Sequence, residues 1–320
     1  MSIMAILALV VPAAIYAAAP LMLTALGGLF SERSGVINIG LEGLMVVGAF
    51  SAIVTTLTLE SAGMGPASTW LGLLAAIVIG ALFSLTHAVA SIHFRADQVV
   101  SGVALNLLAV GLCVFLIKLI YDKGQTDYIQ NRFFRFDVPV LSDIPFIGPL
   151  FFSNTYITSF IAIGLAIVVY FVIYFTPFGL RIRSVGEHPQ AADTMGINVT
   201  RMRYIGVMLS GAFGGLGGAA LAVTVTGNFS GTTIAGQGFM ALAALIFGKW
   251  HPLGAMGAAL FFGFAQALSI TGAQIPMLSS VPSVFLLIAP YVLTILALAG
   301  FVGRSEGPKA LGSAYLKGSR

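Results

Sequence analysis

Few side chains in this chain could carry out specific chemistry, and they do not form a catalytic pattern. The four histidines lack the HExxH or i, i+4 spacing that would hold a metal ion. No nucleophile is arranged with a base, and the phosphate-binding motif GxxxxGK[ST] does not occur. We therefore expect no catalytic residue, no metal site and no cofactor bound by this chain, and we expect it not to be an enzyme.

The other candidates are polar residues in two glycine-rich segments, where the expected chemistry is hydrogen bonding to a polar ligand. The segment SERSGVINIGLEG contains Asn38 and Glu42, and the segment TVTGNFSGTTIAGQG contains Asn228 and Gln237. Amide side chains supply both donors and acceptors, which suits a polar ligand in a place with little water. Asn38 could instead cap the helix that follows it, and Glu42 could stay near the cytoplasmic surface in contact with Arg33 or a backbone N–H.

Two more residues are candidates for a ligand path. Asn106 stands among apolar residues 103–117, where an amide either bonds to a neighbouring helix or meets a ligand. We favour the bond between helices for Asn106. Phe229 follows Asn228 directly, so its ring would line the same path.

The elements that must position these residues are membrane-spanning helices. The chain is 58% hydrophobic and 8% charged, with a mean hydropathy of +1.01, whereas about a quarter of the residues of a soluble protein are charged. A hydrocarbon core of about 30 Å requires roughly 20 apolar residues per helix. This length predicts an all-α polytopic bundle of about nine spans, with a range of eight to ten. The predicted spans are 4–29, 44–59, 70–92, 99–121, 155–175, 205–226, 239–249, 253–271 and 282–303.

An internal repeat accompanies the two glycine-rich segments. Residues 39–45 resemble residues 234–240 at a constant offset of 195, and five predicted spans separate the two copies. An odd number of spans makes the copies face opposite sides of the membrane, so an inverted repeat is predicted. Such repeats place the substrate path at their interface, lined by interrupted helices. The short spans 44–59 and 239–249 are accordingly predicted to be parts of broken helices.

The basic residues predict the orientation of the chain. If loop 176–204 is cytoplasmic, 11 lysines and arginines lie inside and 4 lie outside, which places the N-terminus outside and the C-terminus inside. The predicted organisation is one transmembrane domain over 1–303, an extracytoplasmic loop at 122–154 and a cytoplasmic tail at 304–320. Aromatic residues of the outer loop either lie in the membrane interface or cover the outer mouth. The apolar spans are expected to contact membrane lipid. Because the lysines and arginines lie in short loops and at the C-terminus and not on one face, we expect no contact with nucleic acid.

The segment 176–204 is charged and capable of forming a helix between two apolar spans. Pro189 suits the first turn of a helix, and Gly196 suits the position just past its end. A short helix over 189–195 is therefore predicted, and a membrane protein that keeps such a loop is expected to use it to contact a soluble partner.

The residues of this loop carry a resemblance to a known family. The spacing of Gln190, Ala191, Ala192 and Gly196 resembles the EAAxxxG coupling loop of ABC-importer permeases, with Gln in place of the commonest Glu. The strings GLFSERSGVINIGLEGLMVVGAF, RADQVVSGVALNLLAVGL, FGLRIRSVGEHPQAADTMGINV and LSGAFGGLGGAALAV resemble the branched-chain amino acid and sugar permease superfamily, and its nucleoside-uptake branch most of all. The resemblance covers roughly residues 21–303.

The resemblance implies a bacterial plasma-membrane importer with several partners. These are cytoplasmic ATPase subunits that bind ATP and Mg²⁺, a second related permease, and an extracytoplasmic substrate-binding lipoprotein. It also implies alternating access driven by ATP. The implied ATPase-coupling contacts are Glu187, Pro189, Gln190, Ala191, Ala192 and Gly196.

Other cargoes and other classes of protein remain open at this point. Ribose or another sugar is the alternative cargo, followed by riboflavin-like ligands. An ion-coupled secondary transporter also uses inverted repeats and broken helices, but it requires titratable residues within its spans. A membrane-embedded enzyme requires clustered His, Asp or Glu at one depth.

Overall fold

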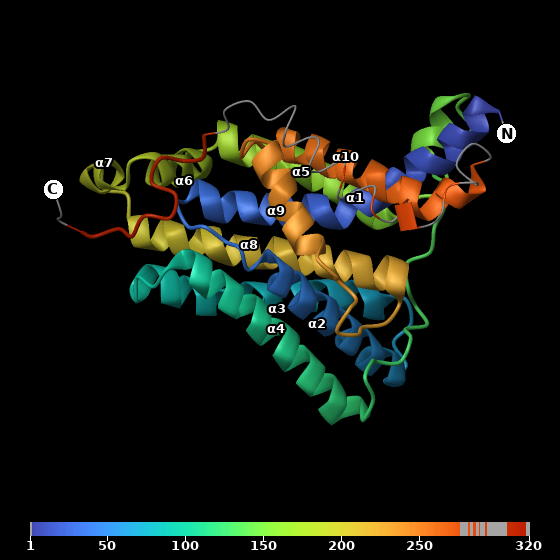
Figure 1. Ribbon diagram of the computed structural model, residues 1–320, viewed down its shortest axis with the longest axis horizontal. Helices are drawn as coiled ribbons and strands as arrows, with labels where there is room; N and C mark the ends of the chain where they lie inside the picture. Colours follow the sequence, from blue (N-terminus) through green and yellow to red (C-terminus); the bar gives the residue numbers. More distant parts are fainter. Residues whose placement is uncertain are drawn as a thin grey trace.

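The computed structural model describes residues 2–275 and 306–317, together with isolated positions between them. The described residues form a bundle of α-helices (Figure 1). The helices are α1 (Ile3–Arg33), α2 (Leu41–Ser61), α3 (Ala67–Ala88), α4 (Gln98–Tyr121), α5 (Ile157–Phe175), α6 (Pro177–Glu187), α7 (Pro189–Thr194), α8 (Val199–Leu221), α9 (Gln237–Phe247) and α10 (Pro252–Thr271). Short π-helical turns extend α3 to His93 and α8 to Thr226.

The membrane-spanning helices follow the sequence prediction closely. Within the described part of the chain, seven helices are long and apolar enough to cross a membrane. The shorter apolar helix α9 corresponds to the predicted span 239–249. The ninth predicted span, 282–303, lies outside the described residues apart from isolated positions. The chain is therefore an all-α, multi-pass membrane protein.

The prediction that the second span is a short piece of a broken helix is wrong. Helix α2 has 21 residues and begins at Leu41, not at 44. Its polar first turn is helical because neighbouring side chains satisfy the backbone there. The Asn38 side chain accepts from Gly40 N–H, and the Asn106 side chain accepts from Gly43 N–H. Helix α9, with 11 residues, remains too short to cross alone.

The charged segment between the fifth and sixth predicted spans is more helical than expected. The predicted short helix is present as α7, and Gly196 follows it with φ +82°. Helix α6 precedes α7, and α8 begins at Val199, six residues before the predicted start at 205. The Asn198 side chain caps α8 by accepting from Arg201 N–H, and this cap lets the helix start among polar residues.

The core of the bundle is built around α1 and α8. Helix α1 packs against α5, α8 and α10, and α8 packs against α1, α2 and α3. The glycines of α8 make this close approach possible. A Cβ atom on Gly211 would lie 2.3 Å from Gly80 O of α3, and one on Gly218 would lie 1.9 Å from Met45 O of α2. Gly211 and Gly215, and likewise Gly214 and Gly218, have the GxxxG spacing of closely packed membrane helices, and they act here as packing residues.

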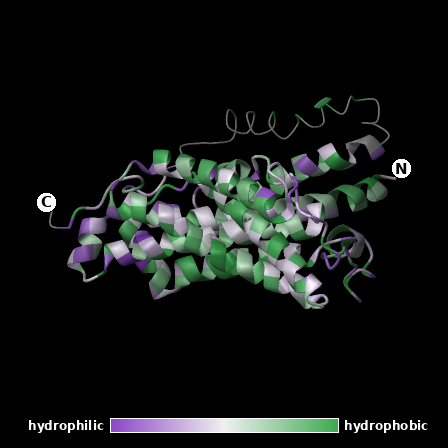
Figure 2. Ribbon diagram, turned by 90° about the horizontal axis from the view of Figure 1, so that it is seen from below, coloured by the Kyte–Doolittle hydropathy of each residue, from purple (hydrophilic) through white to green (hydrophobic). Residues whose placement is uncertain are grey.

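The outer faces and the ends of the bundle differ in character. Large apolar side chains of α3 and α4 point outward, including Leu74, Leu107 and Phe115, which are 55%, 72% and 62% exposed. Hydrophobic residues dominate the length of the bundle, and hydrophilic residues gather toward its ends (Figure 2). This pattern suits a protein surrounded by lipid.

Candidate functional site

The two glycine-rich segments meet through the carboxylate of Glu42. Gly236 N–H donates to Glu42 Oε1 and Gly238 N–H donates to Glu42 Oε2, each at 2.7 Å. These donors lie at the N-terminus of α9, where the positive end of the helix dipole favours an anion. Gly238 must lack a side chain here, since a Cβ atom would lie 2.3 Å from Glu42 Cα. Glu42 therefore holds the start of α9 against the start of α2.

Replacing Glu42 with alanine is expected to destabilise the protein by about 2–4 kcal/mol, because two partly buried N–H donors lose a charged acceptor. Glu42→Gln keeps one side-chain oxygen and should lose about half as much. Thermal unfolding of the purified chain in detergent measures both changes. Equal melting temperatures for Glu42→Ala and the wild type would contradict the assignment.

Asn38 is a buried link between the first glycine-rich segment and α8. Its amide nitrogen donates to Ser210 Oγ at 2.9 Å, and its oxygen accepts from Gly40 N–H at 3.0 Å. The side chain is fully buried. Asn38 thus holds the turn that precedes α2 and ties it to the glycine face of α8, so both of its polar atoms are engaged within the protein.

Asn106 makes the bond between helices that the sequence favours. From α4, its oxygen accepts from Gly43 N–H at 2.7 Å and its nitrogen donates to Ile39 O at 3.0 Å. Both groups of the amide therefore fasten α4 to the first glycine-rich segment.

Gln237 pairs with a residue that the sequence reasoning missed. Gln266, on α10, donates from Nε2 to Gln237 Oε1 at 3.2 Å, and both side chains are partly buried. The same nitrogen lies 3.4 Å from Met240 Sδ. An amide within the predicted span 253–271 is itself a signal, because polar residues inside membrane spans face a partner or a polar path.

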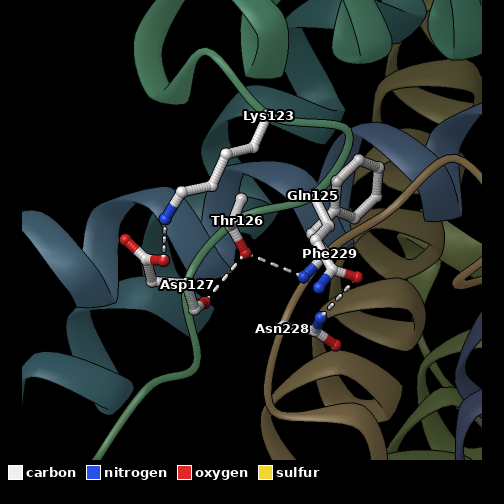
Figure 3. A network of polar contacts seen from close by, with 6 residues as sticks. All are labelled: Lys123, Gln125, Thr126, Asp127, Asn228 and Phe229. Atoms are coloured by element: carbon white, nitrogen blue, oxygen red, sulfur yellow. Dashed lines mark hydrogen bonds and ion pairs between the residues drawn. The ribbon is translucent and has the colours of Figure 1, made fainter.

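Asn228 and Phe229 lie against the loop that follows α4. Thr126 N–H donates to Phe229 O at 2.9 Å, and Phe229 N–H donates to Thr126 Oγ1 at 3.0 Å. The two segments therefore run side by side, and the amides of Asn228 and Gln125 are within 3.5 Å of each other (Figure 3).

The Phe229 ring is buried inside the bundle. It is 1% exposed and packs edge-on against Phe50 at a centroid distance of 5.6 Å. The structure thus brings Asn38, Glu42, Asn106 and Gln237 to the same pair of glycine-rich segments, and it places Asn228 and Phe229 at the contact with the loop that follows α4.

Helix α7 projects at one end of the bundle, beside α6 and the C-terminal segment (Figure 1). Pro189 and Ala192 are buried against the protein, whereas Gln190 and Ala191 are exposed. Met195, which follows α7, is 82% exposed. One side of α7 is thus exposed to solvent, and the opposite side packs against the rest of the protein.

A groove of about 890 Å³ lies beside α7, between α6 and α8. Apolar side chains such as Leu180 and Ile205 line much of it, together with Arg181 and Arg201. No ion pair is found for either arginine within the described residues. The groove and the exposed side of α7 together form a surface that combines apolar area with positive charge.

The fold, the exposed helix α7 and the groove beside it define a class of protein, a multi-pass membrane permease with a helix exposed at one end. A family model described as the permease component of branched-chain amino acid transport systems matches residues 11–298. The chain belongs to this family. It is therefore a transport component and not an enzyme.

Several relatives align with this chain over most of their length. A guanosine ABC transporter permease protein of Bacillus subtilis is 61% identical over 320 residues, which cover 100% of both chains. A nucleoside ABC transporter permease protein of Lactococcus lactis is 53% identical over 93% of each chain. A putative glucose ABC transporter permease protein of Haloferax volcanii is 35% identical over 81% of this chain and 76% of its own.

Proposed function

We propose that this chain is a membrane-spanning permease subunit of an ATP-driven nucleoside importer, with guanosine as the first cargo to test. The observation that carries the proposal is the 61% identity over the full length of both chains to a guanosine permease. The second nucleoside permease, at 53% identity, supports the same class of cargo. The glucose relative, at 35% identity, makes a sugar the second candidate.

The proposed cargo path runs along the contact between the two glycine-rich segments. Gln237 and Gln266 contribute amide donors and acceptors that could hydrogen-bond to a base or a ribose. Both side chains are only partly buried, and their mutual bond at 3.2 Å could exchange for bonds to cargo. Asn38, Glu42 and Asn106 support this path, since their polar atoms hold its backbone in place. Asn228 and Phe229 belong to its outer side, where they contact the outer loop.

The proposed ATPase contact is the exposed side of α7 together with the neighbouring groove. Gln190, Ala191 and Gly196 are exposed there, and small residues permit close packing against a partner. The carboxylate of Glu187, at the end of α6, accepts from Lys309 N–H at 3.4 Å. We therefore assign Glu187 a supporting position at the base of α7. ATP and Mg²⁺ would be bound by the ATPase subunits and not by this chain.

A continuous set of packed elements could carry motion from α7 to the cargo path. Helix α7 is joined to α8 by residues 195–198, and α8 packs against α1, α2 and α3 through its glycines. Ser210, on α8, accepts from Asn38, which also accepts from Gly40 N–H in the turn before α2. A displacement of α8 would therefore move the start of α2, which Glu42 joins to α9. It would in this way change the spacing between the two glycine-rich segments.

The remaining partners and the orientation complete the proposal. A second related permease would form the other half of the translocation unit, and an extracytoplasmic binding lipoprotein would deliver the cargo. We propose that α7 and the C-terminus lie in the cytoplasm of a bacterial cell and the N-terminus outside, and the distribution of basic residues supports this orientation.

Uptake by the reconstituted importer tests this function. The permease pair, its ATPases and the binding protein are placed in liposomes that hold ATP, and uptake of radiolabelled guanosine is measured. ATP-dependent uptake that excess uridine or adenosine reduces, and excess ribose or glucose does not, is the expected result. Uptake of glucose but of no nucleoside would contradict the cargo, and uptake by this chain alone under an ion gradient would contradict the ATP-driven mechanism.

A further inference from the structure

The C-terminal residues 308–317 form an ordered segment against the end of the bundle that carries α6 and α7 (Figure 1). The sequence predicted only a cytoplasmic tail here. Pro308 and Ala310 are buried, and Leu311 and Tyr315 pack against the main hydrophobic core. The segment is therefore part of the folded domain.

Main-chain bonds join this segment to the ends of two helices. Ala310 N–H donates to Gly186 O of α6 at 2.9 Å, and Gly312 N–H donates to Gly35 O, just past α1, at 3.1 Å. The chains approach closely because of the glycines. A Cβ atom on Gly186 would lie 2.2 Å from Arg33 O, and one on Gly35 would lie 3.3 Å from Ala310 O. The ends of α1 and α6 and the C-terminal segment thus meet at one junction.

A buried arginine ties the same segment to α8. The side chain of Arg203 is 2% exposed, and Nη1 donates to Ser313 O at 2.9 Å. No carboxylate forms an ion pair with Arg203 among the described residues. A buried guanidinium without a counter-ion depends on carbonyl acceptors, so the Ser313 carbonyl is part of what keeps this charge in the protein.

Tyr315 carries the contact to α7. Tyr315 packs against the hydrophobic cluster that includes Ala192 of α7. Burial and the nearby Asp193 carboxylate raise the pKa of its hydroxyl, and the charge of Arg203 lowers it. Asp193 belongs to the last turn of α7, and both residues line a recess of about 680 Å³. The C-terminal segment therefore reaches α7 on one side and α1, α6 and α8 on the other.

We propose that residues 308–317 are a strap that holds α7 in place relative to α1 and α8, with Tyr315 and Arg203 as positioning residues for ATP coupling. A six-residue helix is too short to be stable by itself, and here only one residue joins it to α6 and four join it to α8. A second attachment makes α7 move with the bundle instead of yielding locally. This inference rests on the proposed ATP-driven function.

The test is the ratio of guanosine taken up to ATP hydrolysed by the complete reconstituted importer. Tyr315→Phe removes the hydroxyl that shares a recess and interacts electrostatically with the Asp193 carboxylate, and the ratio should fall by about fivefold, the equivalent of one polar interaction of about 1 kcal/mol. Arg203→Leu should lower the ratio at least as much, while Arg203→Lys keeps one donor for the Ser313 carbonyl and should restore most of it. ATP hydrolysis and the melting temperature of Tyr315→Phe should stay near those of the wild type.

Ser313→Ala is the matched control, because the strap uses the Ser313 carbonyl and this change leaves that carbonyl in place. Its ratio should equal that of the wild type. If Tyr315→Phe loses uptake, hydrolysis and melting temperature together, the segment has only a structural role and the proposal is overturned. An unchanged ratio in Tyr315→Phe and Arg203→Leu overturns it as well. Absence of ATP-driven uptake in the wild type would instead contradict the proposed function.

Discussion

Gly196→Arg is expected to reduce ATP-driven uptake by at least tenfold while the permease stays folded. Gly196 follows α7 with φ +82°, and a Cβ atom there would meet nothing within 4 Å. The change therefore costs only about 1 kcal/mol of backbone strain. The long charged side chain would project from the surface proposed to contact the ATPase. Uptake into proteoliposomes and the amount of ATPase that co-purifies measure the effect.

Gly196→Asn is the matched control, because asparagine tolerates this left-handed backbone and is small. It should retain most of the uptake and bind the ATPase. Wild-type uptake by Gly196→Arg would show that this surface does not couple to the ATPase. A loss of folded Gly196→Arg, seen as aggregation on size-exclusion chromatography, would contradict the open space that surrounds the residue.

Gly218→Leu is expected to destabilise the bundle by more than about 3 kcal/mol, so that little folded protein is recovered. A Cβ atom at this position would lie 1.9 Å from Met45 O, and the helix backbones of α8 and α2 would have to separate. No side-chain rotation can relieve an overlap that involves the main chain. Fluorescence-detected size-exclusion chromatography of the expressed permease measures the folded fraction.

Gly111→Leu provides the comparison, because Gly111 is also a helix glycine and a Cβ atom there meets nothing within 4 Å. Its folded yield should equal or exceed that of the wild type, since leucine favours a helix over glycine by up to about 1 kcal/mol. Equal yields for the two variants would mean that α8 and α2 are not in contact at Gly218.

The features that local sequence could predict are those whose signal lies within one segment. A run of about 20 apolar residues marks a span wherever it packs, and Pro189 and Gly196 mark the two ends of α7 by their own backbone preferences. The same rule failed at α2, where a polar first turn concealed the helix start at Leu41. The missing information was the side chain of Asn106, 63 residues away, which accepts from Gly43 N–H.

The candidate site divides in the same way. Gly-rich breaks and their polar residues were visible, but the spacing of residues could not tell which polar atoms were already paired. Asn38 and Asn106 have both their donors and their acceptors occupied, whereas Gln237 has a partner in Gln266 that no motif indicated. Pairing of this kind depends on which helices pack together. No local sequence pattern indicates that Gln266 of α10 lies beside Gln237 of α9.

The sequence by itself determined that this protein is a multi-pass membrane protein with a short helix that begins at Pro189, and the resemblance of its motifs implied a permease. Hydrophobicity and helix capping act over a few neighbouring residues, so their outcome can be predicted without knowing the fold. Only the tertiary structure decided that Glu42 holds Gly236 and Gly238 across 194 and 196 residues, and that the C-terminal segment reaches α7. Those contacts depend on which helices pack against each other. Many side chains of the same types occur in the chain, and only the packing decides which donor meets which acceptor.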